Sequence, residues 1–356
     1  MSEFMSYDPW AEITTRNGYA GDEMVAMLQK AIRRGKEEDA LHAAYEMYIT
    51  SPQFEEKLWR RLLCISVEDI VDAHQQAGTF GYEEVAYLLL LGRLPAAEEL
   101  AQFNQILANA RQMPAAFTED MILKAPSRNI MNQLARSVLA LYSFDDNADD
   151  ASPENILRQS IELIARFPLI AANALMAKRH YFEGNSLYLH NPLPELSVAE
   201  NLLRMTRADK SYTAQEAHLL DLMLILHAEH SSNNSTFVCR AISSSGTDTY
   251  SAIAGAVGSL KGPLHGGANA KVLQMFRTIR DTVGATPTDE ALGACLDDLL
   301  DGKTGDRSGK LYGLGHAVYT MSDPRAIVIK KYAAALAREK EGAIQIQRQH
   351  FDIRHI

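Results

Sequence analysis

Two glycine-framed histidines have residue types and spacing that fit chemistry on a small electrophile. The first, His265, lies in Lys-Gly-Pro-Leu-His-Gly-Gly-Ala-Asn. Pro263 interrupts the preceding element and the two glycines free the backbone, so we expect the imidazole at the N-terminus of a helix over residues 267–284. The positive end of the helix dipole disfavours a protonated ring, and a neutral ring can donate to a carbonyl oxygen as it becomes an enolate. A histidine that only caps a helix in a Gly-rich turn is the alternative.

The second histidine, His316, lies in Gly-Leu-Gly-His-Ala-Val-Tyr. Gly313 and Gly315 let the backbone approach a ligand closely, because neither carries a side chain. The small side chains of Ala317 and Val318 leave their backbone amides accessible. The pattern predicts a ligand-binding loop.

An arginine follows this loop at the start of a predicted helix. Asp323-Pro324 is a strong pair for the N-cap and first helical position, which places Arg325 in the first turn. A helix N-terminus with a guanidinium suits the binding of a carboxylate. By itself the segment fits a surface arginine after a turn equally well.

A pair of histidines precedes both motifs in the sequence. His227 and His230 lie three residues apart in Leu-His-Ala-Glu-His, which is not the His-Glu-x-x-His spacing of zinc hydrolases. We therefore predict no metal site, and expect one of the two histidines to line a polar pocket. In the polar cluster that follows, Asn234 can also hold a ligand.

The composition restricts the class of protein. Of 356 residues 47% are hydrophobic and 22% charged, and no uninterrupted apolar run approaches the roughly 20 residues that a membrane span needs. A net charge of -10 argues against broad nucleic-acid binding. Three scattered cysteines and the lack of a secretory signal pattern favour the cytoplasm. We expect small molecules or further copies of the chain as partners, and neither nucleic acid nor a membrane.

Helical periodicity dominates the chain and predicts an all-α fold. The expected helices cover residues 22–34, 37–49, 53–65, 82–92, 96–112, 128–142, 153–180, 197–206, 213–230, 233–259, 267–284, 288–301 and 324–341. The acidic run over residues 145–150 is interpreted as a solvated loop tip without a function.

Taken together, the histidine motifs resemble the citrate synthase family over about residues 65–342. The motifs are His230 with Asn234, the segment around His265, and Gly-Leu-Gly-His-Ala-Val-Tyr-Thr-Met-Ser-Asp-Pro-Arg ending at Arg325. Supporting matches include Gly-Thr-Phe-Gly-Tyr-Glu-Glu-Val-Ala-Tyr from residue 78 and Ser-Ser-Ser-Gly-Thr-Asp-Thr-Tyr-Ser from residue 243.

The resemblance implies a mostly helical homodimer, with a large and a smaller helical domain. It implies an acyltransferase of the tricarboxylic acid cycle that condenses acetyl-CoA, as a cosubstrate, with oxaloacetate, and no tightly bound cofactor. His265 would polarise the acetyl carbonyl and His316 would hydrogen-bond the oxaloacetate carbonyl. His230, Asn234 and Arg325 would bind oxaloacetate. The CoA adenine would meet the backbone of Gly313, Leu314, Gly315, Ala317 and Val318.

The chain departs from the family pattern at both ends. The family's proton-abstracting aspartate follows the second histidine in a motif resembling Val-Asp-Phe-Tyr-Ser, which this sequence lacks; Asp352 is a poor substitute. Residues 1–65 weakly resemble the helical C-terminal region of replication-associated AAA+ ATPases. We predict three parts: an atypical N-terminal segment (1–65), a large domain (66–262) and a small, C-terminally truncated domain (263–356). Lineage-specific variation and a recombined or truncated gene explain these ends equally well.

These departures leave three functions open. The first is citrate synthase activity. The second is a catalytically impaired homologue that binds a ligand or interacts with another protein. The third is 2-methylcitrate synthase activity, since that enzyme shares the same motifs and would prefer propionyl-CoA.

Overall fold

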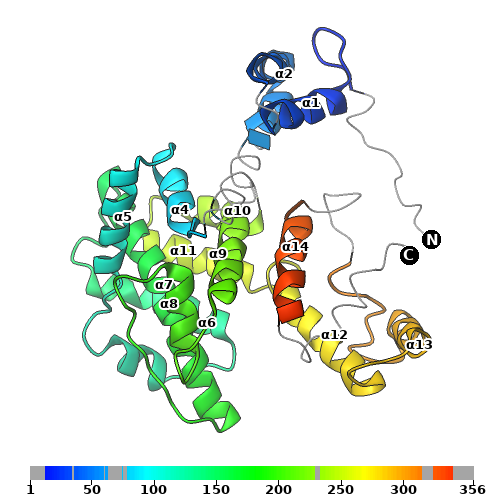
Figure 1. The fold of residues 1–356 in the computed structure, drawn as a ribbon. Helices are drawn as coiled ribbons and strands as arrows, with labels where there is room; N and C mark the ends of the chain where they lie inside the picture. The colour runs from blue at the N-terminus through cyan, green and yellow to red at the C-terminus, as the bar shows by residue number, and fades with distance from the viewer. Residues whose placement is uncertain are drawn as a thin grey trace. The chain divides into compact units, whose positions relative to one another are not determined.

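The computed structural model describes residues 13–33, 36–59, 61–62, 74, 78–228, 233–314 and 324–339. Within these residues the chain is helical, with one isolated β-bridge between Thr14 and Ala20, so the predicted all-α class is confirmed (Figure 1). The helices are α1 (Gly21–Arg33), α2 (Glu37–Thr50), α4 (Tyr82–Leu91), α5 (Ala97–Ala110), α6 (Ile130–Leu141), α7 (Pro153–Glu183), α8 (Val198–Thr206), α9 (Ala214–Ala228), α10 (Asn234–Ser243), α11 (Thr249–Leu260), α12 (Ala268–Val283), α13 (Asp289–Leu300) and α14 (Pro324–Glu339). A π-helical turn (Thr118–Leu123) and a 3-10 turn (Tyr142–Phe144) were not predicted.

The described residues fall into two compact units. The first holds residues 13–81 together with residues 225–228 and 324–328, and the second holds the remainder. The predicted boundaries after residues 65 and 262 stay predictions, because this division follows contacts rather than function.

The first unit has its own apolar core between α1, α2 and a helical segment at residues 52–59. That core consists of Met24, Val25, Leu28, Ala43, Met47, Phe54 and Leu58. Glu46 is 1% exposed, and its carboxylate accepts from the backbone and side-chain amides of Asn17 at 2.8 and 2.7 Å. Burial raises the pKa of Glu46, but hydrogen bonds from Thr15 and Asn17 outweigh burial and lower the pKa. A buried carboxylate thus anchors the loop before α1.

The core of the second unit lies where α6, α7 and α11 pack together (Figure 1). Its buried members include Phe117, Ile122, Val138, Leu141, Ile170 and Tyr250. The central helix, α7, begins at a Ser152 N-cap followed by Pro153 and ends at Gly184, whose φ of 72° is in the left-handed region. By length and composition α7 is the one helix in the described ranges that could cross a membrane, with half of its most apolar window buried in the protein.

The predicted single helix over residues 233–259 is wrong. It is two helices, α10 and α11, separated at residues 244–248. Gly246 adopts a φ of 76°, and the Asp248 carboxylate caps α11 by accepting from the Ser251 amide at 2.8 Å. Asn234 at the start of α10 bonds Ser259 near the end of α11, so the two helices run antiparallel. The break therefore brings the start of α10 beside the residues that follow α11.

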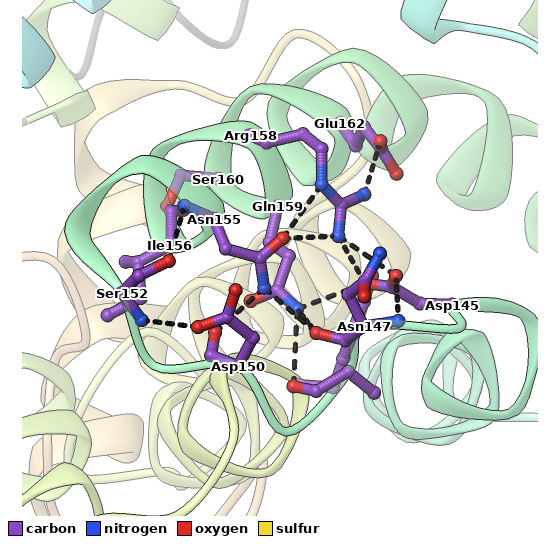
Figure 2. A network of polar contacts seen from close by, with 12 residues as sticks. Asp145, Asn147, Asp150, Ser152, Asn155, Ile156, Arg158, Gln159, Ser160 and Glu162 are labelled. Carbon is purple, nitrogen blue, oxygen red and sulfur yellow. Dashed lines mark hydrogen bonds and ion pairs between the residues drawn. The ribbon is translucent and has the colours of Figure 1, made fainter.

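The interpretation of residues 145–150 as a solvated tip is wrong for Asp145. Its side chain is 8% exposed and forms an ion pair with Arg158 at 2.7 Å (Figure 2). The same carboxylate accepts from Gln159 at 3.0 Å and from the hydroxyl of Tyr250, on α11, at 2.8 Å. The network joins the loop after α6 to α7 and α11, as expected for a charge that is buried with its partners.

Helices α12 and α13 form a separate apolar cluster within the second unit. Its buried members are Met275, Ile279, Leu292, Cys295 and Leu299. Leu311 and Tyr312 pack against this cluster from the segment that follows α13. The cluster therefore holds the chain just before Gly313 against α12.

Candidate active site

The turn that carries His265 is tightly wound between α11 and α12. The His265 amide donates to the Gly262 carbonyl at 3.0 Å, and the His265 carbonyl accepts from Ala268 at 3.1 Å. The Gly267 amide donates to the carbonyls of both Leu260 and Gly262, at 3.1 and 3.0 Å. Since α12 begins at Ala268, the prediction that His265 lies at the N-terminus of this helix is confirmed.

The two glycines after His265 are required for close packing. A Cβ atom on Gly267 would lie 2.4 Å from the Lys261 carbonyl oxygen, although the φ of Gly267 is an ordinary -61°. A Cβ atom on Gly266 would lie 2.6 Å from a methyl group of Leu260. The pair thus lets the chain fold back onto the end of α11, which is a reason different from the backbone freedom that the sequence suggested.

The imidazole of His265 is held by the first turn of α10. Its Nε2 lies 2.7 Å from the Oγ of Ser235, and both residues are half-buried. If the hydroxyl donates to Nε2, a neutral ring carries its proton on Nδ1, which remains available as a donor. The contact orients the ring, and in this tautomer Nδ1 is the atom that can donate to a substrate.

Asn234, which was predicted to hold a ligand, directly precedes Ser235, and its side-chain amide is engaged within the protein. Its Nδ2 donates to the Oγ of Ser259 at 2.7 Å, while Asn233 caps α10 by accepting from the Thr236 amide. The residue is exposed. Asn234 and His265 are therefore brought together at the junction of α10, α11 and α12.

Gly313 lies beside Val272, near the start of α12. Gly313 has a φ of 88°, and a Cβ atom there would lie 3.4 Å from a methyl group of Val272. The side chain of Leu314 is 59% exposed. The predicted glycine is therefore required for its left-handed backbone conformation, whereas a Cβ atom would meet Val272 only at an ordinary contact distance.

The other predicted site residues are only partly within the described chain. Arg325 is the second residue of α14 and half-buried, so its predicted place in a first helical turn is confirmed. Arg325 belongs to the first compact unit, whereas His265 belongs to the second. His230, Gly315, His316, Ala317 and Val318 lie outside the described residues.

Ser235 is the site residue that sequence reasoning missed. It lies in the polar cluster after His230, in which only Asn234 was singled out from the sequence. The available signal was its position directly after Asn234, but only the contact of α10 with the turn after α11 shows that it meets His265. Leu264, beside the histidine, is 98% exposed, so the turn presents an apolar side chain to solvent.

The described geometry suits stabilisation of a developing oxyanion. A histidine oriented by a hydroxyl, at the N-terminus of a 16-residue helix, offers one hydrogen-bond donor in a positive local potential. Such a preorganised donor lowers the energy of an enolate more than that of the neutral carbonyl from which it forms.

The sequence matches the family model described as "Citrate synthase, C-terminal domain" over residues 63–352. The matched segment contains every predicted site residue. Residues 1–62 lie outside it, and their resemblance to AAA+ ATPases stays a prediction.

Related sequences carry the same family name. The chain is 36% identical to citrate synthase of Deinococcus radiodurans over 261 residues, which is 73% of this chain and 64% of that protein. It is 35% identical to citrate synthase of Acidithiobacillus ferridurans, covering 75% of this chain and 68% of that one. It is 34% identical to 2-methylcitrate synthase 2 of Corynebacterium glutamicum, covering 78% and 67%. The chain thus spans about two thirds of the length of these relatives, and slightly less for the first.

Solved structures agree with the fold. The structure of citrate synthase from Pyrobaculum aerophilum has a TM-score of 0.61 at 28% identity, covering 77% of this chain and 64% of that one. The structure of citrate synthase from Thermoplasma acidophilum in a ternary complex with carboxymethyl coenzyme A and oxaloacetate has a TM-score of 0.62 at 25% identity, covering 76% of this chain and 66% of that one.

Proposed function

Because the chain belongs to the citrate synthase family, we propose that it condenses acetyl-CoA with oxaloacetate to give citrate and free CoA. The observation that carries this proposal is the contact of Ser235 with His265 at the head of α12. It orients the imidazole at the N-terminus of a helix, where a ring N–H can face a developing enolate.

The proposed reaction assigns a separate role to each predicted residue. His265 donates to the acetyl carbonyl oxygen as a methyl proton leaves and the enolate forms. His316 donates to the carbonyl oxygen of oxaloacetate, and the enolate carbon forms a bond to that carbonyl carbon. His230, Asn234 and Arg325 hold oxaloacetate. Water then cleaves the thioester, and the CoA thiol is released.

The CoA adenine is proposed to contact the backbone of residues 313–318. Gly313 supports this, because its left-handed conformation and its approach to Val272 present backbone rather than side chain. Among the residues that the structure describes, we propose none as the base that removes the methyl proton.

The partners and setting remain proposals of the same kind. We propose a homodimer with acetyl-CoA as a cosubstrate, supported by the family membership and by the liganded Thermoplasma relative. We propose a cytoplasmic location, supported by Cys239 and Cys295, which are free thiols.

A second candidate activity is 2-methylcitrate synthesis from propionyl-CoA. It is favoured by the Corynebacterium relative and by a Bacillus subtilis relative named citrate/2-methylcitrate synthase, 32% identical over 261 residues. One extra methylene discriminates between acyl chains by only about 10- to 200-fold. The two activities are therefore compared as kcat/KM ratios on the same preparation.

Release of free thiol from acetyl-CoA in the presence of oxaloacetate tests the proposal. We expect wild-type protein to release thiol, and His265→Ala to be slower by at least about 10²-fold, as for loss of an oxyanion donor. His190→Ala is the matched control, because His190 is, like His265, a half-buried histidine, and its ring bonds the Ala208 carbonyl instead of Ser235. Equal rates for wild type and His265→Ala, or no release by either, would overturn the proposed function and favour the impaired homologue.

A further inference from the structure

An exposed loop between α13 and Gly313 is held in place by one carboxylate. Asp306 accepts from the Ser308 amide at 3.1 Å, from the Tyr312 hydroxyl at 2.7 Å and from the Lys271 ammonium at 3.0 Å. The hydrogen bonds from Ser308, Tyr312 and Lys271, in that order, hold the pKa of Asp306 well below its usual range. Asp306 is therefore ionised throughout the neutral range, with each of its partners acting as a donor.

The three partners come from both sides of the loop. Lys271 is in the first turns of α12, and Tyr312 directly precedes Gly313. The ammonium of Lys271 also lies 5.9 Å from the centre of the Tyr312 ring. The carboxylate thus joins the helix that follows His265 to the segment predicted to meet CoA.

The packing around this carboxylate leaves little room for other arrangements. Tyr312 packs on the apolar cluster of α12 and α13, and Gly313 lies against Val272, the neighbour of Lys271. The cavity enclosed by Lys271, Asp306, Tyr312 and their neighbours is about 10 Å³, room for about one water molecule. A cavity this small offers no ligand site. The polar cluster therefore has a structural role, which is to hold Tyr312 and Lys271 in place.

We propose that Asp306 is a positioning residue for CoA binding, which fixes Gly313 and Leu314 relative to His265 through Lys271 and Tyr312. The inference rests on the proposed function, because it concerns the cosubstrate of that reaction. His265 lies three residues before α12, and Gly313 packs on α12. The distance between His265 and the segment proposed to contact the adenine is therefore set by α12 and by the contacts of Asp306 with Lys271 and Tyr312. Without the Asp306 carboxylate, Gly313 and Leu314 can leave the conformation that binds CoA. The apparent affinity for CoA then falls in proportion to the fraction of molecules that keep this conformation.

The test compares Asp306→Asn with wild type in steady-state kinetics on the full chain. If the segment is correctly placed about a tenth of the time without the carboxylate, KM for acetyl-CoA rises about tenfold. We expect kcat and KM for oxaloacetate to stay within about twofold, because His265 is not displaced from Ser235. Asp281→Asn is the matched control: Asp281 is an exposed aspartate of α12 that pairs with Arg280, and we expect its replacement to change neither constant.

Tyr312→Phe provides a second, less disruptive variant. It removes one donor to Asp306 and keeps the ring in its apolar cluster, so we expect KM for acetyl-CoA to rise about threefold. The double variant should match Asp306→Asn alone, because both changes act through one contact. A loss of kcat without a change in KM, an equal rise of both KM values, or wild-type constants in both variants would overturn the inference.

Direct binding of CoA separates this inference from the proposed function. Calorimetry with CoA itself needs no turnover, and Asp306→Asn should weaken binding about tenfold relative to wild type and Asp281→Asn. An inactive wild type that shows this difference refutes the proposed reaction and supports the role of Asp306. An active wild type with equal CoA affinity in all three proteins refutes the role of Asp306 and leaves the reaction standing.

Discussion

Asp145 and Asp306 each accept hydrogen bonds from several donors, but the two carboxylates lie in different surroundings. The side chain of Asp145 is 8% exposed and bonds Arg158 and Gln159 of α7 (Figure 2). It also accepts from Tyr250 of α11. Asp306 is 21% exposed at its side chain and bonds residues of one loop and the first turns of α12. One carboxylate joins core helices, while the other places a loop.

The two carboxylates should contribute to different properties of the protein. A desolvated charge with three donors contributes to folding, because removing it leaves buried donors unpaired. A solvated charge on a loop contributes little to global stability, because water replaces it, yet it restricts the loop to one geometry. We therefore expect Asp145 to affect stability and Asp306 to affect the binding of a cosubstrate.

Asp145→Asn should have the largest effect on stability. Burial raises the pKa of Asp145, but hydrogen bonds from Arg158, Gln159 and Tyr250 outweigh burial and lower it to about 2. Against the usual 3.8, this shift corresponds to about 2 kcal/mol of stability at neutral pH. Urea unfolding should show a lower midpoint at an unchanged slope, whereas Asp146→Asn, at the exposed neighbouring position, should match wild type. An unchanged midpoint in Asp145→Asn would break the contrast with Asp306.

The same free energy should depend on pH. Because the folded pKa of Asp145 lies below its unfolded value, the stabilisation is present above about pH 4 and is lost as the pH falls toward 2. The stability difference between wild type and Asp145→Asn should therefore shrink by about 2 kcal/mol between pH 5 and pH 2. Unfolding midpoints measured at several pH values test this, and a difference that stays constant contradicts the ionised network.

Removal of single hydroxyl groups should give the smallest effects. Tyr250→Phe deletes the donor from α11 to Asp145 and should cost about 1 kcal/mol. Tyr142→Phe is its matched partner: that hydroxyl donates to the exposed Asp149 at 2.7 Å, and its loss should be undetectable. Equal midpoints for the two variants in urea would show that burial of the acceptor does not set the contribution.

The helices and the histidine turn were predictable because local rules determine them. Apolar spacing marked α6, α7 and α12, while Asp323-Pro324 marked the start of α14. Long-range contacts were not encoded in any local pattern. The bond of Ser235 to His265 and that of Tyr250 to Asp145 join residues 30 and 105 positions apart. The single predicted helix over 233–259 failed for a different reason, because apolar periodicity continued across a break that Gly246 and Asp248 create.

If the protein uses His265 to condense acetyl-CoA with oxaloacetate, it forms a carbon–carbon bond, and an isotope label can follow that bond directly. Wild-type protein is incubated with acetyl-CoA labelled with ¹³C at the methyl carbon and with oxaloacetate, and the products are followed by NMR. We predict that the label appears in a methylene group of citrate, and that His265→Ala suppresses it while His190→Ala does not. Label that remains in acetyl-CoA, or that appears in acetate by simple thioester hydrolysis, would contradict the claim.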